Sequence, residues 1–495
     1  MDNGRASRRG QLLIQTLVLS ALSVVFIGVL TNLAVFNVDI AKRSYYSEVA
    51  FQTAEAGIEY YRWHLAHAPD DFEDGTGGPG PYVHEFKDKE LVRIGQFSLD
   101  ITPPPSGSTL VTILSTATVD ADPSAVRKIR VRLAIPSFTK YAVAANDDLR
   151  FGEGTDVFGP IYANGGIHFD GTAHNLVSSA KDAYNDPDHE GGNEFGVHTH
   201  RRAPPQTGID LNFQAGEAPP TIPVPVRGDV FLSGRQFPVP AIDFVGLSAD
   251  LADLKTDVQQ GNGRYFAPSS GLGYHLVLKT NDTFDVYTVT ATTPVPNGCT
   301  SVQGQQGWGT WSIQDETILQ SNQQFPSSGL LFFEDNLWVN GQINTARLSI
   351  AAARFPDTPG QRKSITVNND LLYTNYDGQD VIALIAQGNF NVGLVSEDDL
   401  RIDAALVAQN GRAGRYYYRP PTPPNQDRCS PYHIRQVITL YGSIVTNQRY
   451  GFAYTDGTGY QTRNIIYDQN LAYAPPPNFP LVSDEYELIS WEEVR

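Results

Sequence analysis

The amino-acid sequence predicts an α+β protein that is mainly β, with three parts in order along the chain. A long N-terminal transmembrane helix precedes a small antiparallel β meander, and a large irregular right-handed parallel β-helix-like domain follows. Three observations predict this order. Residues 12–38 form an apolar run without a charge, and residues 127–135 alternate polar and apolar side chains. Residues 139–480 repeat short strand-like runs between Asn, Asp and Gly turns.

The composition agrees with a β-rich body and excludes one class of partner. The chain has 44 Gly, 33 Pro, 24 Tyr and 24 Phe among 495 residues, which favours a turn-rich, aromatic β structure. It has 36 Lys and Arg against 54 Asp and Glu, a net charge of −18. Because nucleic-acid binding rewards basic surfaces, we expect no nucleic-acid partner.

Residues 11–68 are predicted to form one long helix that crosses a membrane over residues 12–38. A membrane helix needs roughly 20 mostly apolar residues, and this run exceeds that length. Residues 1–10 form a short leader with three arginines, which the positive-inside bias keeps on the cytoplasmic side. The rest of the chain is then expected outside the cytoplasm, anchored in the inner membrane by a single pass.

The part of this helix beyond the membrane is predicted to pack on another element. Val49, Ala54, Ile58, Tyr61 and Leu65 recur at spacings of three to five residues, which places them on one helix face. The following Pro is a stop signal. The whole helix would then measure on the order of 80 Å.

The leader and helix resemble those of the type IV pilin superfamily. A basic leader that ends in Gly10 is followed by an apolar helix, and residues 54–60 read AEAGIEY, similar to the helix of PilX-like minor pilins. The resemblance implies that a prepilin peptidase cuts between Gly10 and Gln11, and that Gln11 becomes an N-methylated terminus. It implies partners among other pilins and the pilus assembly machinery.

One position departs from the major pilins. Their fifth mature residue is a glutamate that pairs with the terminal amine of a neighbouring subunit, whereas this chain has Gln15. A glutamine can donate and accept hydrogen bonds but cannot neutralise an ammonium group. Some minor pilins at a filament tip also lack this glutamate, so the resemblance implies a priming or tip-display role, with cell-surface adhesion as one outcome.

A small β subdomain is predicted over residues 69–138. After a Gly-, Asp- and Pro-rich loop, strand-like runs cover residues 91–101, 110–119 and 127–135. The last run alternates strictly, which indicates a sheet with one buried face. We expect the outer half of the helix to cover that face, as in a pilin head.

The large body is predicted over residues 139–480, with a tail over residues 481–495. Strand-plus-turn units recur at about 16- to 38-residue spacings, which suits the coils of a solenoid with loops inserted between them. Insertions that include a small β subdomain are expected over about residues 180–325. The stretch 466–480 also resembles the ends of PilX-like minor pilins.

The richest polar cluster in the sequence is a candidate metal site. Asp186, Asp188, Glu190 and Glu194 fall at positions 1, 3, 5 and 9 of a calcium-loop pattern, but Val197 occupies position 12. A transition metal held by the neighbouring histidines is an alternative, with ligands His189, His198 and His200. A solvated acidic loop that binds no cofactor is the third interpretation.

The two cysteines, Cys299 and Cys429, lie in turn-like contexts. A disulfide between them is plausible if the body lies outside the cytoplasm. Two unrelated thiols in loops are the alternative, because sequence spacing cannot show whether the residues lie close enough to bond.

The sequence shows no catalytic motif, so no enzyme is expected. No triad elbow, phosphate loop or nucleotide fingerprint occurs. Two functions besides a filament subunit remain open. One is a signal-anchored adhesin or structural β-helix, and the other is a carbohydrate-active β-helix enzyme with carboxylates on one face of its coils. The tyrosines and prolines of residues 416–424 are expected to form an exposed loop.

Overall fold

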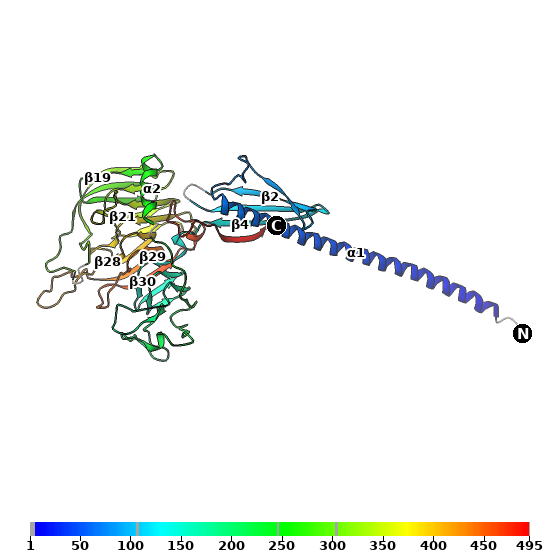
Figure 1. Ribbon diagram of the computed structural model, residues 1–495, viewed down its shortest axis with the longest axis horizontal. Coiled ribbons are helices and arrows are strands. Elements are labelled where there is room, and N and C mark those ends of the chain that lie inside the picture. Colours follow the sequence, from blue (N-terminus) through cyan, green and yellow to red (C-terminus); the bar gives the residue numbers. More distant parts are fainter. Residues whose placement is uncertain (1–4, 105–107, 245–246, 302–304, 495) are drawn as a thin grey trace. The chain divides into compact units, whose positions relative to one another are not determined.

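The computed structural model describes residues 5–104, 108–244, 247–301 and 305–494. The chain divides into two compact units. The small unit comprises Met1–Pro103, Val111–Ala134 and Leu488–Arg495, and the large unit comprises Pro104–Leu110 and Ile135–Glu487. The described structure is mainly β, with a long N-terminal apolar helix (Figure 1).

The small unit is a single sheet packed on the second half of the long helix. Helix α1 spans Arg5–His67. The strands lie in the order β1-β2-β3-β4-β31, and β1 to β4 pair as an antiparallel meander. Their bounds are Tyr82–Lys87 (β1), Arg93–Thr102 (β2), Val111–Val119 (β3), Asp122–Ala134 (β4) and Glu487–Val494 (β31).

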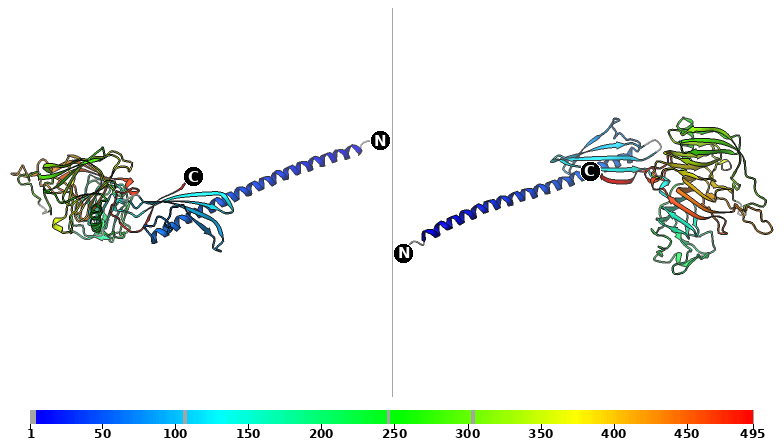
Figure 2. Two further views of the ribbon diagram at one scale, coloured as in Figure 1. Left: turned by 90° about the horizontal axis from the view of Figure 1, so that it is seen from above. Right: turned by 180° about the vertical axis from the view of Figure 1, so that it is seen from behind.

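The sheet face that α1 covers is built by strict alternation. Every second residue of β3 is buried, because side chains on a strand point alternately to its two faces. From the predicted helix face, Ala54, Ile58, Tyr61 and Leu65 are buried, while Val49 is half-buried. The N-terminal half of α1 continues beyond this sheet (Figure 2).

Sequence reasoning missed strand β1 of the small unit and also strand β31. Strand β31 comes from the segment expected as a tail, yet it pairs with β4 at the sheet edge. Arg127 of β4 lies 2.5 Å from Glu493, and Arg130 lies 2.9 Å from Glu492. The chain therefore returns to the small unit after completing the large one.

Parallel pairing dominates the large unit, and the strands stack into three ladders. The members of the first ladder pair in the order given: β16 (Arg264–Phe266), β20 (Leu330–Phe333), β22 (Arg347–Ala352), β25 (Val381–Ala386), β27 (Asp399–Ala408), β29 (Ile434–Thr446), β5 (Val143–Ala145), β8 (Ile161–Ala163), β11 (Val177–Ser179) and β15 (Arg235–Gln236).

The second ladder has its own strands, whereas the third shares β27 and β29 with the first. The second contains β17 (Gly273–Lys279), β21 (Leu337–Ile343), β23 (Ile365–Thr366), β26 (Phe390–Val392) and β28 (Ala413–Arg415). The third adds β24 (Leu371–Tyr373), β30 (Gly459–Tyr467), β7 (Thr155–Phe158) and β10 (Thr172–Ala173) to β27 and β29. A short set, β6 (Leu149–Phe151), β9 (Ile167–Phe169) and β14 (Val197–His198), also pairs in parallel.

Two antiparallel insertions and one helix depart from this stacking. Strands β17, β18 (Thr283–Thr292) and β19 (Ile313–Gln324) form an antiparallel meander within the predicted insertion. Strands β12 (Ala183–Tyr184) and β13 (Glu194–Phe195) form a small antiparallel pair. Helix α2 (Leu247–Gln259) packs against β16 and β20. The short 3₁₀ helices are η1 (Phe138–Lys140), η2 (Ala215–Glu217), η3 (Pro359–Gln361) and η4 (Gln469–Ala472).

The core of the large unit lies on both faces of the first ladder. All six residues of β25 are buried; Ile382, Leu384 and Ala386 join the main apolar core, and Val381, Ala383 and Ile385 join a second one that includes α2. The described residues nevertheless form no closed, regular solenoid. Strand lengths vary from two to thirteen residues, and the antiparallel insertions interrupt the repeat.

Gly57 marks the closest approach of α1 to the sheet of the small unit. A Cβ atom there would lie 2.5 Å from Ser115 Oγ and 2.8 Å from Phe97 Cδ2, closer than packed atoms tolerate. We therefore predict that Gly57→Val weakens the docking of α1 by about 1–3 kcal/mol, the usual cost of overpacking a core. Hydrogen–deuterium exchange of peptides from β2 and β3 should become faster in this variant.

Gly28→Val provides the control for this prediction. A Cβ at Gly28 has no neighbour within 4 Å, so exchange in β2 and β3 should not change. Unchanged protection in Gly57→Val would show that the helix does not depend on this close approach.

Candidate functional site

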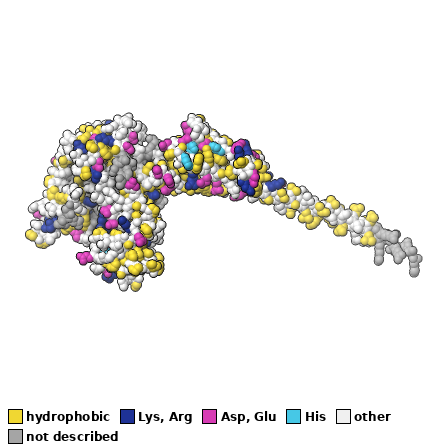
Figure 3. Space-filling model, in the orientation of Figure 1, with side chains coloured by type: hydrophobic (Ala, Val, Ile, Leu, Met, Phe, Trp, Pro, Cys, Tyr) yellow, Lys and Arg dark blue, Asp and Glu magenta, His cyan; other side chains and the backbone are white. Residues whose placement is uncertain are grey.

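The N-terminal half of α1 is an apolar surface that faces no other described element. The large apolar side chains from Leu12 to Ile40 are all exposed, from 48% to 70%. Within the described residues, α1 is the one helix long and apolar enough to cross a membrane, with a mean hydropathy of 2.4 over its most apolar window. Figure 3 shows this half as an almost uninterrupted apolar rod. Such a helix fits a membrane anchor or a signal sequence.

The predicted processing residues lie on this part of the helix. Gln11 and Gln15 are both exposed. Gly10 lies within α1, but its surroundings are outside the described side chains.

The large unit contains a second candidate site, a buried group of histidines and carboxylates. Asp186, His189, Glu194, His198 and His200 each point one ligand atom at a common centre, and these atoms all lie within 4.8 Å of one another. We call this group the histidine cluster. The side chain of His189 is 5% exposed, and the side chains of the other four members are 0–1% exposed.

Strand pairing positions the floor of the histidine cluster. In the short parallel set, Arg150 of β6 pairs with His168 of β9, and His168 pairs with His198 of β14. Residues at matched positions of parallel strands stack on the same face. Ile167 and Val197 are in the main apolar core, so the histidines that follow them lie on the opposite face. The β12–β13 pair supplies Glu194, and the segment between these two strands supplies Asp186 and His189.

Three imidazole nitrogens converge on one carboxylate oxygen. Glu194 Oε2 lies 2.7 Å from His189 Nε2 and 3.1 Å from the Nε2 atoms of both His198 and His200. Asp186 Oδ2 lies 3.4 Å from His198 Nε2 and 3.6 Å from His189 Nε2. The atoms that face the centre are thus three nitrogens and two oxygens.

The remaining oxygen of each carboxylate is held by the backbone. Asp186 Oδ1 accepts a hydrogen bond of 3.0 Å from the Asp188 amide, and Glu194 Oε1 accepts one of 2.7 Å from the Gln214 amide. These bonds fix both carboxylates with their second oxygens turned toward the histidines.

His168 and Asp170 support the histidine cluster from behind. His168 Nδ1 lies 2.6 Å from Asp186 Oδ2, and its Nε2 lies 2.7 Å from Asp170 Oδ2. Asp170 Oδ1 in turn accepts a hydrogen bond of 2.8 Å from the His200 amide. Burial disfavours a charged imidazole, but the hydrogen bonds to both aspartates outweigh it and raise the pKa of His168 to about 9. A protonated His168 satisfies both carboxylates.

The same environment keeps the cluster carboxylates ionised. Burial alone would raise the pKa of Asp186, but its hydrogen bond with His168 holds that pKa well below its usual range. For Glu194, burial is likewise outweighed by His200 and His198, and its pKa is also lowered. Burial lowers the pKa of His198.

The structure divides the four residues of the predicted calcium loop. Asp186 and Glu194 face the histidine cluster, whereas Asp188 lies 2.9 Å from Arg150 and 2.5 Å from Arg449, and Glu190 is exposed. His189, His198 and His200, considered as ligands of a transition metal, do come together. Sequence reasoning missed His168 and Asp170. The sequence did contain a signal for these two residues, because His168 and Asp170 alternate with the apolar residues Ile167 and Phe169.

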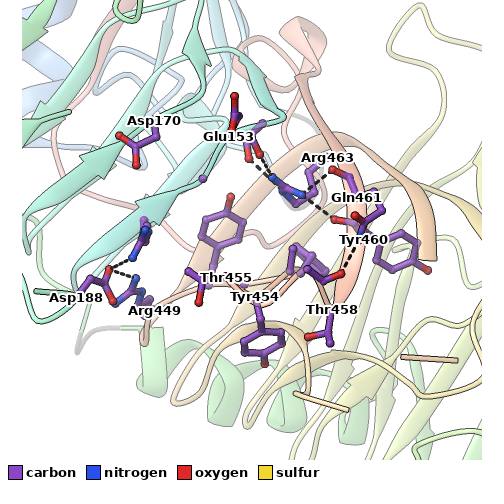
Figure 4. A pocket seen from close by; sticks show the side chains of 18 of the residues that line it. Glu153, Asp170, Asp188, Arg449, Tyr454, Thr455, Thr458, Tyr460, Gln461 and Arg463 are labelled. Atoms are coloured by element: carbon purple, nitrogen blue, oxygen red, sulfur yellow. Dashed lines mark hydrogen bonds and ion pairs between the residues drawn. The ribbon is translucent and has the colours of Figure 1, made fainter. Parts of the chain in front are cut away.

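A cavity of about 730 Å³ has Asp170, Asp188 and Arg449 among its lining residues. Figure 4 shows Asp188 paired with Arg449 on one side and Arg463 on the other. Arg463 donates hydrogen bonds to the carbonyl oxygens of Tyr460 (2.7 Å) and Gln461 (2.9 Å). The guanidinium groups of Arg449 and Arg463 are therefore already bonded to other residues that line the cavity.

Cys299 and Cys429 form a disulfide in the structure, with Cα atoms 4.8 Å apart. Both cysteines are buried with Leu394, Tyr416 and Tyr418. The tyrosines of residues 416–418 are therefore buried, contrary to the exposed loop expected from the sequence. The buried guanidinium of Arg415 explains this, because it lies 4.7 Å from the Tyr418 ring and donates to the carbonyls of Leu394 and Tyr432.

Comparisons with known proteins find matches among solved structures alone. No family model matches the chain, and no curated protein matches it. Among solved structures the chain is similar to the competence-associated pilin ComZ from Thermus thermophilus, with 13% sequence identity and a TM-score of 0.29. That match covers 90% of this chain and 97% of the other. A TM-score this low does not establish a common fold.

We predict that removing the disulfide loosens the aromatic cluster around it. The bond joins residues 130 positions apart, and losing such a link typically costs about 2–4 kcal/mol. The double variant Cys299→Ser/Cys429→Ser should unfold at lower guanidinium concentration than the oxidised protein. Reductant should shift the wild type in the same direction and leave the double variant unchanged. Equal midpoints for both proteins would contradict the prediction.

Proposed function

We propose that this protein is a minor-pilin-like subunit of a type IV pilus or related filament, with a role in assembly, priming or tip display. The observation that carries the proposal is the division of α1 into two halves. One half is an exposed apolar rod, and the other half is docked on an antiparallel sheet in the same compact unit. This is the arrangement that the pilin resemblance of the sequence implies.

The exposed apolar half of α1 has to be covered by lipid or by other apolar helices. Residues 12–38 span about 40 Å as a helix, enough to cross a hydrocarbon core of about 30 Å. Exposed apolar surface of this extent is costly in water, and it is relieved either in a bilayer or among similar helices. A pilin-like helix uses both environments, first in the inner membrane and then in the filament.

The leader sets the proposed orientation and processing. Arg5, Arg8 and Arg9 hold the N-terminus in the cytoplasm, and both globular units lie outside it. A prepilin peptidase removes residues 1–10, and Gln11 becomes the N-methylated terminus. Other pilins and the assembly machinery are then the partners of the apolar rod.

Gln15 and the large unit favour a terminal position in the filament. Gln15 presents a neutral amide where a major pilin has the carboxylate that contacts the subunit above it, and a tip subunit has no subunit above it. We further propose that the parallel ladders are coils of a right-handed β-helix that is displayed outside the filament. A head of this size would crowd a regular lattice, but a tip has room for it. Its role there is binding or display and not catalysis.

The N-terminus of the mature protein tests this function. We predict that mass spectrometry of wild-type cells finds a chain that starts at N-methylated Gln11, whereas cells without prepilin peptidase keep residues 1–10. Gly10→Val should block the cut, because the peptidase reads the residue before the cleavage site. Gly28→Val, at an exposed position farther along the same helix, is the matched control and should be processed normally.

An uncut chain in both strains would contradict the proposal. It would leave a signal-anchored adhesin or structural protein as the better interpretation.

A further inference from the structure

We propose that the histidine cluster binds one divalent transition-metal ion of the zinc class, with Asp186, His189, Glu194, His198 and His200 as its ligands. The site lies wholly inside the large unit. It is independent of the filament role, because it concerns neither α1 nor the leader.

Hydrogen bonding fixes which nitrogens of two histidines carry protons. His189 Nδ1 lies 3.3 Å from the Glu190 carbonyl oxygen, and His198 Nδ1 lies 3.3 Å from the Phe195 carbonyl oxygen. A carbonyl oxygen can only accept, so each Nδ1 must donate. In the neutral ring, the Nε2 lone pair then faces the carboxylates. Such a contact is stable only with a positive charge between the two groups, supplied by a metal ion or by a proton on Nε2.

His198 provides an independent sign of a missing partner. Its side chain is fully buried, yet Nε2 makes no hydrogen bond with any described group, although Glu194 Oε2 lies 3.1 Å away. Buried polar atoms without a partner are rare and costly. This nitrogen points at the centre of the cluster, which is where a metal would accept its lone pair.

The spacing of the donor atoms suits a small cation. Zinc binds nitrogen and carboxylate oxygen at about 2.0–2.2 Å, so neighbouring ligand atoms lie about 3 Å apart. The distances from Glu194 Oε2 to the nitrogens of His198 and His200, and from Asp186 Oδ2 to His198, are 3.1, 3.1 and 3.4 Å. His189 Nε2 and Glu194 Oε2 lie closer, at 2.7 Å, and would separate slightly around the ion.

The charges of the buried ligands also favour a divalent cation. Asp186 and Glu194 supply two negative charges, and three neutral imidazoles add none, so one divalent cation makes this dry site neutral. An unbalanced buried charge would be strongly destabilising.

The donor types exclude calcium and indicate a structural site. Calcium prefers six to eight oxygens, whereas imidazole nitrogen suits zinc and its neighbours in the transition series. All five ligands are nearly or fully buried, so no open coordination position faces solvent. The metal would tie the segment between β12 and β13 to β14. Asp170 and His168 orient the ligands from outside.

Metal analysis of the purified full-length protein in detergent tests the inference. After chelator treatment and incubation with Zn²⁺, we expect about one zinc per chain by mass spectrometry, as for a single closed site. X-ray absorption should show nitrogen and oxygen neighbours with imidazole scattering. Zinc should also raise the thermal midpoint of the large unit.

Three variants distinguish this site from adventitious binding. His198→Gln removes a ligand and should abolish stoichiometric zinc. His168→Gln leaves every ligand in place and should weaken zinc binding by roughly 10- to 100-fold, as expected for a positioning residue. His174→Gln is the matched control, because His174 lies in the same unit but outside the histidine cluster, and it should still bind one zinc.

Circular dichroism of each protein shows whether it is folded. A folded wild type that takes up no zinc would overturn the proposal, and would leave a cluster held together by protons alone. Equal zinc binding by wild type and His198→Gln would overturn the assigned site. Displacement of zinc by an equimolar amount of calcium would overturn the donor chemistry.

Discussion

The large unit depends on the parallel pairing of β29 with its neighbours on both sides. β27 pairs with residues 437–446 of β29, whereas β30 pairs with residues 434–442 and β5 with residues 444–446. A strand of three residues such as β5 cannot satisfy its backbone or bury its side chains alone. β29 therefore supplies the template on which residues 143–236 stack, although they precede it in the chain by about 200 to 300 positions.

The histidine cluster is a consequence of that stacking. Strand β9 pairs with β6 and β14, and these strands turn apolar side chains into the core shared with the ladders. Their opposite face would be solvated if the segment between β12 and β13 did not cover it. Covering it buries ionisable groups, which the structure tolerates only because each carboxylate is held by a backbone amide and by histidine. Such a departure from an apolar interior is typical of a functional or metal-binding site.

The two units differ in how far local pattern predicts them. In the small unit, alternation over residues 127–135 and the spacing of Ala54, Ile58, Tyr61 and Leu65 indicate both the sheet and the helix face that covers it, because these signals arise within a few residues. The edge strand β31 gives no such signal, since its residues are largely exposed and its partner is more than 350 positions away. Likewise, Tyr416 and Tyr418 are buried against the guanidinium groups of Arg412 and Arg415, contacts that exist only in the folded chain.

The sequence by itself determined a charge-free apolar helix of membrane-spanning length, a meander after it, and a body of short strands between turns. Each of these follows from side-chain periodicity, which is a local property of the chain. Only the tertiary structure decided which strands stack, that the C-terminal segment returns to the small sheet, and that Asp186 and Glu194 share a centre with three histidines while Asp188 and Glu190 do not. Those outcomes depend on contacts between residues far apart in sequence, where the choice of partner is made by packing and by the cost of burying an unpaired charge.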